Sequence, residues 1–150
     1  MPVRLSESAK RLLDLRVFAH LATLMPDGSP KAEPVWVARE GDRVLVATDR
    51  RSLKARNIAA DPRVALSLVD PDDPYEQLLI RGRVVETRPD PELTALDALS
   101  LKYIGGPFPR RKWPSRVVLV VEADLARHYR SPLSHYSATD RNGADERSPA

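Results

Sequence analysis

The sequence predicts a mainly β protein, an antiparallel barrel of six strands with short flanking helices. Six runs rich in β-branched residues are joined mainly by turns, and only short helical patterns interrupt them. Fourteen prolines punctuate the chain between these runs. A length of 150 residues suits one domain with a sizeable core. We assign residues 1–136 to that domain and expect the polar, aperiodic stretch 137–150 to be a disordered tail.

The first half of the chain opens with a capped amphipathic helix over residues 6–14, followed by a buried strand over 17–25. Pro26-Asp27-Gly28 fits a tight turn in which Gly28 takes a positive φ. The return strand contains Pro30 and Pro34, and proline cannot donate to a ladder. We therefore expect this strand, which continues to residue 39, to lie at an edge or to carry a bulge.

The remaining elements follow at similar spacing. Ser52 is expected to cap a short basic helix, and Gly82 to permit a bend in a long strand. Asp90-Pro91-Glu92 is expected to open a helix with proline in its first turn. The predicted strands of this half cover residues 43–48, 63–69, 75–87 and 116–123.

Composition excludes several classes of protein. The chain has no cysteine, which favours an intracellular, cytoplasmic protein, and no run approaches a membrane span. The net charge is +3, but the arginines are interleaved with Asp and Glu rather than gathered in one stripe. We therefore expect no nucleic-acid partner, and an oligonucleotide-binding barrel is disfavoured because it would expose aromatic residues beside basic ones.

The usual catalytic constellations are absent from the sequence. Only three histidines occur, and His20, in an apolar strand, is expected to be a hydrogen-bonded core residue. No nucleophile elbow, P-loop, dinucleotide fingerprint or short-spaced metal motif is present. A bound cofactor is therefore the simplest source of chemistry.

One stretch suggests where an anionic group would bind. Thr48 ends a strand, Ser52 caps the helix that follows, and Lys54 lies in the first turn of that helix. The free amides there carry partial positive charge, so a phosphate ester would find both donors and charge. The alternative is a solvated basic helix that merely covers the barrel mouth.

The order of these elements resembles the pyridoxamine 5'-phosphate oxidase-like split barrels, also called FMN-binding split barrels. It is most similar to their small oxidoreductases that use coenzyme F-420 or FMN. The resemblance covers residues 17–121 and implies that Thr48, Ser52 and Lys54 hold the cofactor phosphate. Oxidases of vitamin B6 metabolism carry an arginine where this chain has Leu53. That departure favours coenzyme F-420, with FMN as the alternative.

The resemblance also implies further contacts with the cofactor. Pro34, Val35, Trp36 and Val37 match the strand that lies against the flavin ring, and the two alternatives for Trp36 are stacking near the ring and packing beneath a helix. Asn57 is expected to be a neighbour of the cofactor, with a core-facing helix residue as the alternative. Gln77 matches a position that reaches the cofactor from the other subunit, or it is an exposed strand-end amide.

Two expectations concern partners. Several strands, above all residues 117–121, are apolar on both faces, so one face needs a helix or a second subunit to cover it. A homodimer with the cofactor site at the interface is expected on that ground and from the resemblance. The basic and aromatic loop Arg110–Trp113 is a candidate site for an anionic substrate or the oligoglutamate tail of coenzyme F-420, or a solvated surface. The reaction expected is hydride transfer between the cofactor and a small organic substrate, and a non-enzymatic flavin-binding module is the rival.

Overall fold

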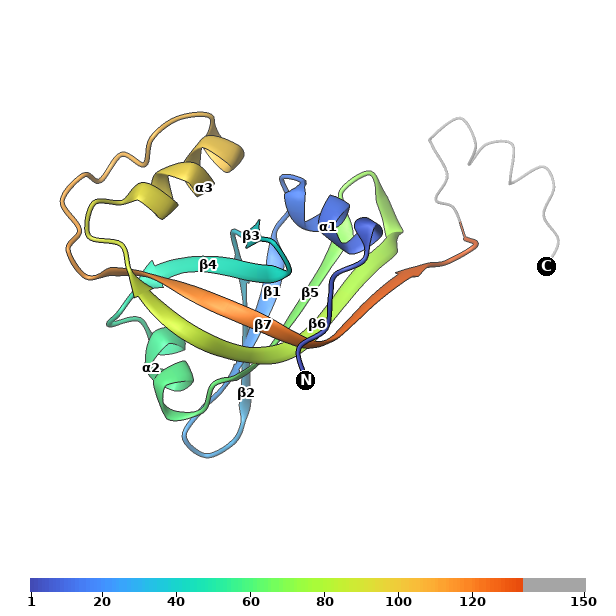
Figure 1. Ribbon diagram of the computed structural model, residues 1–150, viewed down its shortest axis with the longest axis horizontal. Helices are drawn as coiled ribbons and strands as arrows, with labels where there is room; N and C mark the ends of the chain where they lie inside the picture. Colours follow the sequence, from blue (N-terminus) through green and yellow to red (C-terminus); the bar gives the residue numbers. More distant parts are fainter. Residues whose placement is uncertain (134–150) are drawn as a thin grey trace, which may run out of the picture.

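Seven antiparallel strands form one sheet in the computed structural model, which describes residues 1–133. Their order is β2-β1-β5-β6-β7-β4-β3, and the sheet curls so that the long strands β6 and β7 run across the whole molecule (Figure 1). Residues 134–150, including the predicted tail 137–150, lie outside the described residues. In chain order the elements are α1 (Glu7–Asp14), β1 (Ala19–Leu24), β2 (Pro30–Val35), β3 (Ala38–Glu40), β4 (Arg43–Asp49), α2 (Leu53–Ala60), β5 (Arg63–Asp70), β6 (Asp73–Pro89), α3 (Thr94–Ile104) and β7 (Arg116–Arg130).

The core lies inside the curled sheet and follows from the alternation of the strands. In β1, β4 and β5 every second residue is buried, as the period of a strand requires. Leu21, Val46 and Leu66 from these strands join Leu12 and Leu13 of α1 in one apolar cluster. Helix α1 therefore closes one end of the barrel with its buried face.

The strand β7 is buried on both faces, as the sequence predicts. Leu119 and Val121 belong to the core cluster, while Val118 and Val120 point to the opposite face and are at most 1% exposed. Helix α3 packs against β4, the neighbour of β7. Its own residues Leu96 and Leu99 are buried. One chain thus covers both faces of β7, and this strand by itself demands no second subunit.

The structure has seven strands where six were predicted, because the strand expected over residues 34–39 is broken. Strand β2 ends at Val35, and β3 begins at Ala38. Between them, the Val37 N–H donates to Tyr103 Oη at 3.0 Å, and the Val37 carbonyl accepts from Lys102 Nζ at 2.7 Å. Side chains of α3 take the backbone groups that would otherwise have continued the ladder.

Three further expectations need correction. Helix α3 begins at Thr94 rather than at Asp90, because Leu93 is left-handed (φ 64°) and Asp90 caps from a distance by accepting from the amides of Ala95 and Leu96. Strand β7 continues past residue 123 to Arg130 because it stays paired with β6. His20 is exposed rather than in the core, because it points to the outward face of β1, while its neighbours Ala19 and Leu21 point inward and are buried.

Gly82 lies where β6 and β7 bend, as the sequence predicts. The register between the two strands shifts at Arg81/Gly82. A Cβ at Gly82 would lie 2.0 Å from the carbonyl oxygen of Glu122, which is backbone and cannot rotate away. The bend therefore depends on the missing side chain.

We predict that Gly82→Ala lowers the free energy of unfolding by at least ~2 kcal/mol, because the two backbones must separate. Urea denaturation measures the change. Gly106→Ala is the matched control, since no atom lies within 4 Å of its added Cβ, and it should change stability by less than ~0.5 kcal/mol. Equal stability of the two variants would contradict the prediction.

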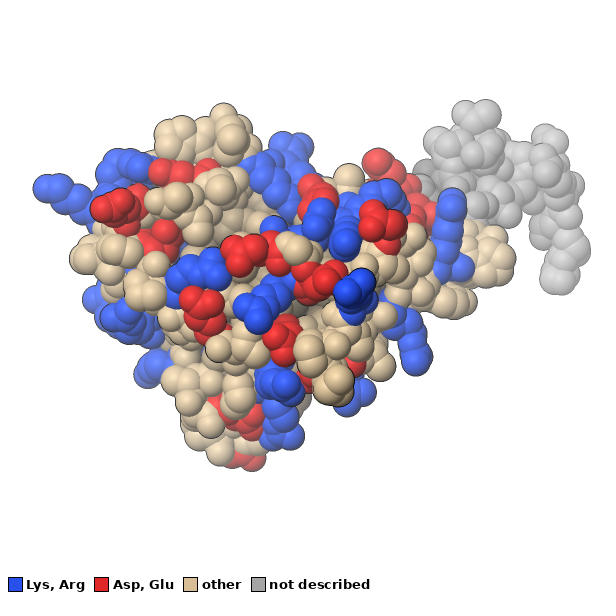
Figure 2. All heavy atoms as spheres, in the orientation of Figure 1, with Lys and Arg blue, Asp and Glu red and all other residues tan. Residues whose placement is uncertain are grey.

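Charge is dispersed over the surface. Figure 2 shows basic and acidic side chains interspersed over the face it presents. Many of these form ion pairs, for example Arg39 with Asp14 and Arg88 with Glu40. Within residues 1–133, no helix combines the length and the apolar character needed to cross a bilayer.

Candidate anion and ring site

Thr48 and Ser52 meet at the start of α2, and Lys54 lies in the first turn of that helix. Ser52 has an extended backbone (φ −64°, ψ 155°), and its Oγ accepts from the Ala55 amide at 3.2 Å, so it caps the helix as predicted. Thr48 Oγ1 lies 2.9 Å from Ser52 Oγ and is almost fully buried. The two hydroxyls and the first turn of α2 therefore form one polar cluster at the end of β4.

Positive potential at this cluster has two sources. The amides of Leu53 and Lys54 have no intrahelical acceptor at a helix start, and the first turn of α2 contains no acidic residue. The second source is Lys54 itself, whose side chain is 18% exposed. These donors fit a phosphate group, which needs several N–H and O–H donors and a nearby cation.

Lys54 is not free, because a carboxylate already pairs with it. Glu33 on β2 lies 3.3 Å from Lys54 Nζ and 3.0 Å from Lys31 Nζ. Burial alone would raise the pKa of Glu33, but the two ammonium groups outweigh burial and lower that pKa below its ordinary value. An incoming anion would therefore replace Glu33 as the partner of Lys54.

Asn57 points away from this cluster toward the core. It is 3% exposed, and its Nδ2 donates to Thr23 Oγ1 at 3.1 Å and to Met25 Sδ at 3.3 Å. Its side chain therefore fastens α2 to β1, which matches the core-facing alternative in the sequence analysis.

The segment Pro34–Val37 lies at the free edge of the sheet, next to Glu33. Val35 belongs to the core cluster, and Val37 is fully buried. Trp36 stacks face to face on Tyr103 of α3, with ring centroids 4.9 Å apart and planes 2° apart. The packing of Trp36 against a helix, one of its two predicted roles, is thus observed, and its other face remains the candidate surface for a ring.

Two neighbouring residues of α3 hold this segment in place. Tyr103 Oη, besides accepting from Val37, donates to the Val17 carbonyl at 2.5 Å. Lys102 Nζ donates to the carbonyls of Leu13 and Val37, both at 2.7 Å. Burial lowers the pKa of Lys102 to about 8, against a smaller opposing effect of Asp14.

The loop Arg110–Trp113 is ordered around Asp49. Trp113 Nε1 and Ser115 Oγ donate to Asp49 Oδ2 at 2.6 and 2.7 Å, and hydrogen bonds, above all from Arg51, hold the Asp49 pKa far below its usual range. The guanidinium groups of Arg110 and Arg116 stack on Trp113. Arg111 is engaged by Asp97. Most of the loop's charge is thus committed to contacts within the chain.

Gln77 is not brought to the other predicted site residues within one chain. It is exposed on the outward face of β6, between Val69 and Tyr129 in the register of the sheet. Asn57, by contrast, contacts Thr23, which lies near the end of β1 and on its buried face. A contact of Gln77 with a ligand at Lys54 would need a second subunit.

Sequence reasoning missed Glu33, Tyr103 and Asp49. Tyr103 lies in a predominantly apolar helical stretch, where a buried tyrosine hydroxyl needs a hydrogen-bond partner and so indicates a hydrogen bond to the backbone. Glu33 between two prolines gave no comparable signal. Within residues 1–133 no group of three His, Asp or Glu side chains is placed to bind a metal ion.

Comparison with known proteins identifies the family. The model of the pyridoxamine 5'-phosphate oxidase family matches residues 5–130, and the chain belongs to this family. A solved structure described as an F420 reductase is 35% identical, with a TM-score of 0.76, and the match covers 82% of this chain and 98% of that one. No match was found among curated proteins.

Two more distant structures share the fold. A conserved hypothetical protein of Mycobacterium tuberculosis is 24% identical (TM-score 0.71), with 92% of this chain and 96% of that one covered. An FMN-binding protein of Nostoc punctiforme, related to pyridoxamine 5'-phosphate oxidase, is 18% identical (TM-score 0.56), with 81% and 85% covered. The predicted split-barrel fold is thus confirmed, with seven strands in place of six.

The buried lysine gives a pH-dependent prediction. Since burial disfavours the charged form of Lys102, the unfolded chain binds more protons than the folded chain between pH 8 and the ordinary lysine pKa of 10.5. Relative to Lys102→Met, the free energy of unfolding should therefore rise by roughly 1–2 kcal/mol from pH 7.5 to 9.5. Denaturant titrations of both proteins measure this difference, and a difference that stays constant with pH would contradict it.

Proposed function

We propose that this protein is an oxidoreductase that transfers hydride between bound coenzyme F-420 and a small organic substrate. The observation that supports the proposal is the pair of hydroxyls of Thr48 and Ser52 at the start of α2, whose first turn carries Lys54 and no acidic residue. Lys54 pairs with Glu33, which precedes the edge segment Pro34–Val37. When bound, the deazaflavin supplies the hydride chemistry. The family membership and the 35% identity to an F420 reductase support the same proposal.

The residues of the chain then have separable tasks. Thr48, Ser52 and Lys54 bind the phosphate, while the segment Pro34–Val37 orients the ring through the backbone of Val35 and Trp36, because the backbone groups of Val37 are taken by α3. The Trp36 side chain limits the position of the ring on one side. The tie between Tyr103 and Val37 keeps that backbone rigid. No side chain of the chain needs to act as a nucleophile.

Leu53 favours coenzyme F-420 over FMN. The residue before Lys54 carries no charge, so one phosphate contact that the resemblance associates with FMN oxidases is missing. Arg51 does not replace it in the structure, because its side chain is paired with Asp49. FMN nevertheless stays the alternative cofactor, and a non-enzymatic flavin-binding module is the alternative function.

Calorimetric titration of the purified protein with coenzyme F-420 and with FMN tests the proposal. We expect tighter binding of coenzyme F-420, and Lys54→Ala should weaken it about ten- to a hundredfold through loss of a charged hydrogen bond. Glu33→Gln should instead tighten binding, by about two- to tenfold, because it removes the carboxylate that competes for Lys54. Variants that change affinity in opposite directions exclude a general loss of folding.

Several results would contradict these expectations. Unchanged affinity in Lys54→Ala would place the anion site elsewhere, and FMN binding tenfold tighter than coenzyme F-420 would reverse the cofactor preference. Lys10→Ala, a change of a lysine on α1, is the control and should bind like the parent. Binding without turnover on any acceptor would favour the non-enzymatic module.

We further propose a homodimer with the cofactor site at the interface. The support is the outward face of β6 and β7, where Leu79 and Tyr129 remain 38% and 50% exposed around Gln77. Exposed apolar side chains gathered on one sheet face are typical of an interface. In such a dimer, Gln77 of one subunit would reach the cofactor bound by the other.

Sedimentation equilibrium at micromolar concentration should give about twice the chain mass of 16.8 kDa. Leu79→Asp should shift this mass toward that of the monomer, because a carboxylate would be buried at the interface. Leu101→Asp, at a leucine that is 65% exposed on α3, should leave the mass unchanged. A monomeric parent would overturn both the dimer and a shared site.

A further inference from the structure

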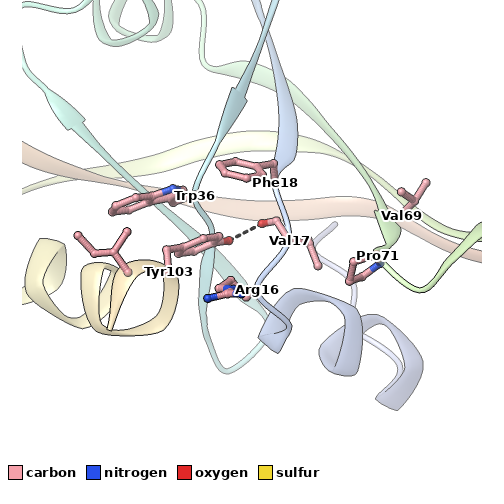
Figure 3. A pocket seen from close by; sticks show the side chains of 8 residues that line it. Arg16, Val17, Phe18, Trp36, Val69, Pro71 and Tyr103 are labelled. Carbon is pink, nitrogen blue, oxygen red and sulfur yellow. Dashed lines mark hydrogen bonds between the residues drawn. The ribbon is translucent and has the colours of Figure 1, made fainter. Parts of the chain in front are cut away.

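An apolar cavity of about 540 Å³ opens beside Trp36. Figure 3 shows its walls, which come from the start of β1, the link between β2 and β3, the end of β5 and the helix α3. The residues that matter here are Arg16, Phe18, Trp36, Val69, Tyr103 and Ile104. Its volume lies within the range of small-molecule sites.

The aromatic wall of the cavity is flat and fixed. Trp36 and Tyr103 stack in parallel, and the Phe18 ring lies 6.0 Å from Tyr103 at 43°. Tyr103 is tied to the backbone of both Val17 and Val37, so it cannot rotate without losing two hydrogen bonds. The cavity is therefore preorganised for a flat apolar body.

Apolar side chains around the opening remain exposed to solvent. Phe18, Val69 and Ile104 are 60%, 42% and 55% exposed, although they surround one hollow. Exposing three large apolar side chains together is unfavourable unless a ligand or partner covers them. The cavity thus has an apolar surface for which one chain provides no cover.

Arg16 gives this cavity its charge. Across residues 1–133, no hydrogen bond or ion pair engages the Arg16 guanidinium, whereas Arg11, Arg39 and Arg111 are each held by carboxylates. Asp14, two residues away, is taken by Arg39. An unpaired guanidinium at the rim of an apolar slot complements a carboxylate on a flat ligand.

We propose that this cavity binds the organic substrate, and that the substrate is a planar apolar molecule with a carboxylate group. Its flat body lies between Phe18 and the stacked pair Trp36–Tyr103, and its carboxylate pairs with Arg16. The proposal rests on the proposed function, because a substrate here would lie beside the segment Pro34–Val37 that holds the cofactor ring. Arg16 is then the residue that sets specificity for acids.

Calorimetric titration of the full chain without cofactor tests the site on its own. The probes are naphthalene-2-carboxylate and the neutral naphthalene-2-methanol, which share a flat body and differ in charge. We expect the acid to bind about tenfold more tightly than the alcohol. Arg16→Gln should abolish this preference and leave the affinity for the alcohol unchanged, while Arg4→Gln, at another exposed arginine, should preserve the preference.

Fluorescence locates the bound probe, because the chain has only two tryptophans. The acid should quench the parent and Trp113→Phe, but it should not quench Trp36→Phe. Equal affinity for the two probes, or quenching that persists in Trp36→Phe, would overturn the proposal. A third result would also overturn it: the parent protein does not bind the acid, and Phe18→Asp dissociates a dimer. In that case a second subunit fills the cavity.

These titrations contain no cofactor, so their outcome is separate from the test of the proposed function. If coenzyme F-420 binds and naphthalene-2-carboxylate does not, the substrate site alone is wrong. If the acid binds with the expected dependence on Arg16 and neither cofactor binds, the proposed redox function is wrong and the acid-binding cavity stands.

Discussion

The hydrogen bonds that Tyr103 and Lys102 make to Val37 are the constraint on which the rest of the site depends. They satisfy both backbone groups of Val37 from a helix that lies 66 residues later in the chain. Because the ladder is broken there, β2 and β3 lie at the two opposite edges of the sheet instead of forming one strand. The opening between them leaves the edge of β2 available, and the same tie stacks Trp36 on Tyr103 and forms the wall of the cavity.

Local signals in the sequence were sufficient for much of the fold. Alternating burial, the cap at Ser52, the positive φ of Gly28 and the close approach at Gly82 each depend on residues near one another or on one strand pair. The break at Val37 was not predictable in this way, because it is made by side chains of α3 that the chain reaches only after four more strands. The outward position of His20 depends on the register of β1, and a run of mostly apolar residues does not specify that register.

The candidate site was predictable to a similar extent. Spacing alone predicted that Thr48 and Ser52 lie together, since a strand end and a helix start are adjacent in sequence. The Glu33 partner of Lys54 comes from another strand, and the use of Asn57 as an anchor for α2 depends on Thr23 across the barrel. Long-range polar pairs of this kind leave no periodic trace in a sequence, so the electrostatic environment of the cluster emerges only from the fold.

The ion pair between Glu33 and Lys54 has a consequence for how binding depends on the solution. Because Lys54 already has an anionic neighbour, capture of a phosphate is an exchange of one anion for another and not the neutralisation of a bare cation. Lys31 remains beside Glu33 and holds the displaced carboxylate. The net change in ionic contacts is therefore small, so association should be less sensitive to added salt than the abundance of basic residues around α2 suggests.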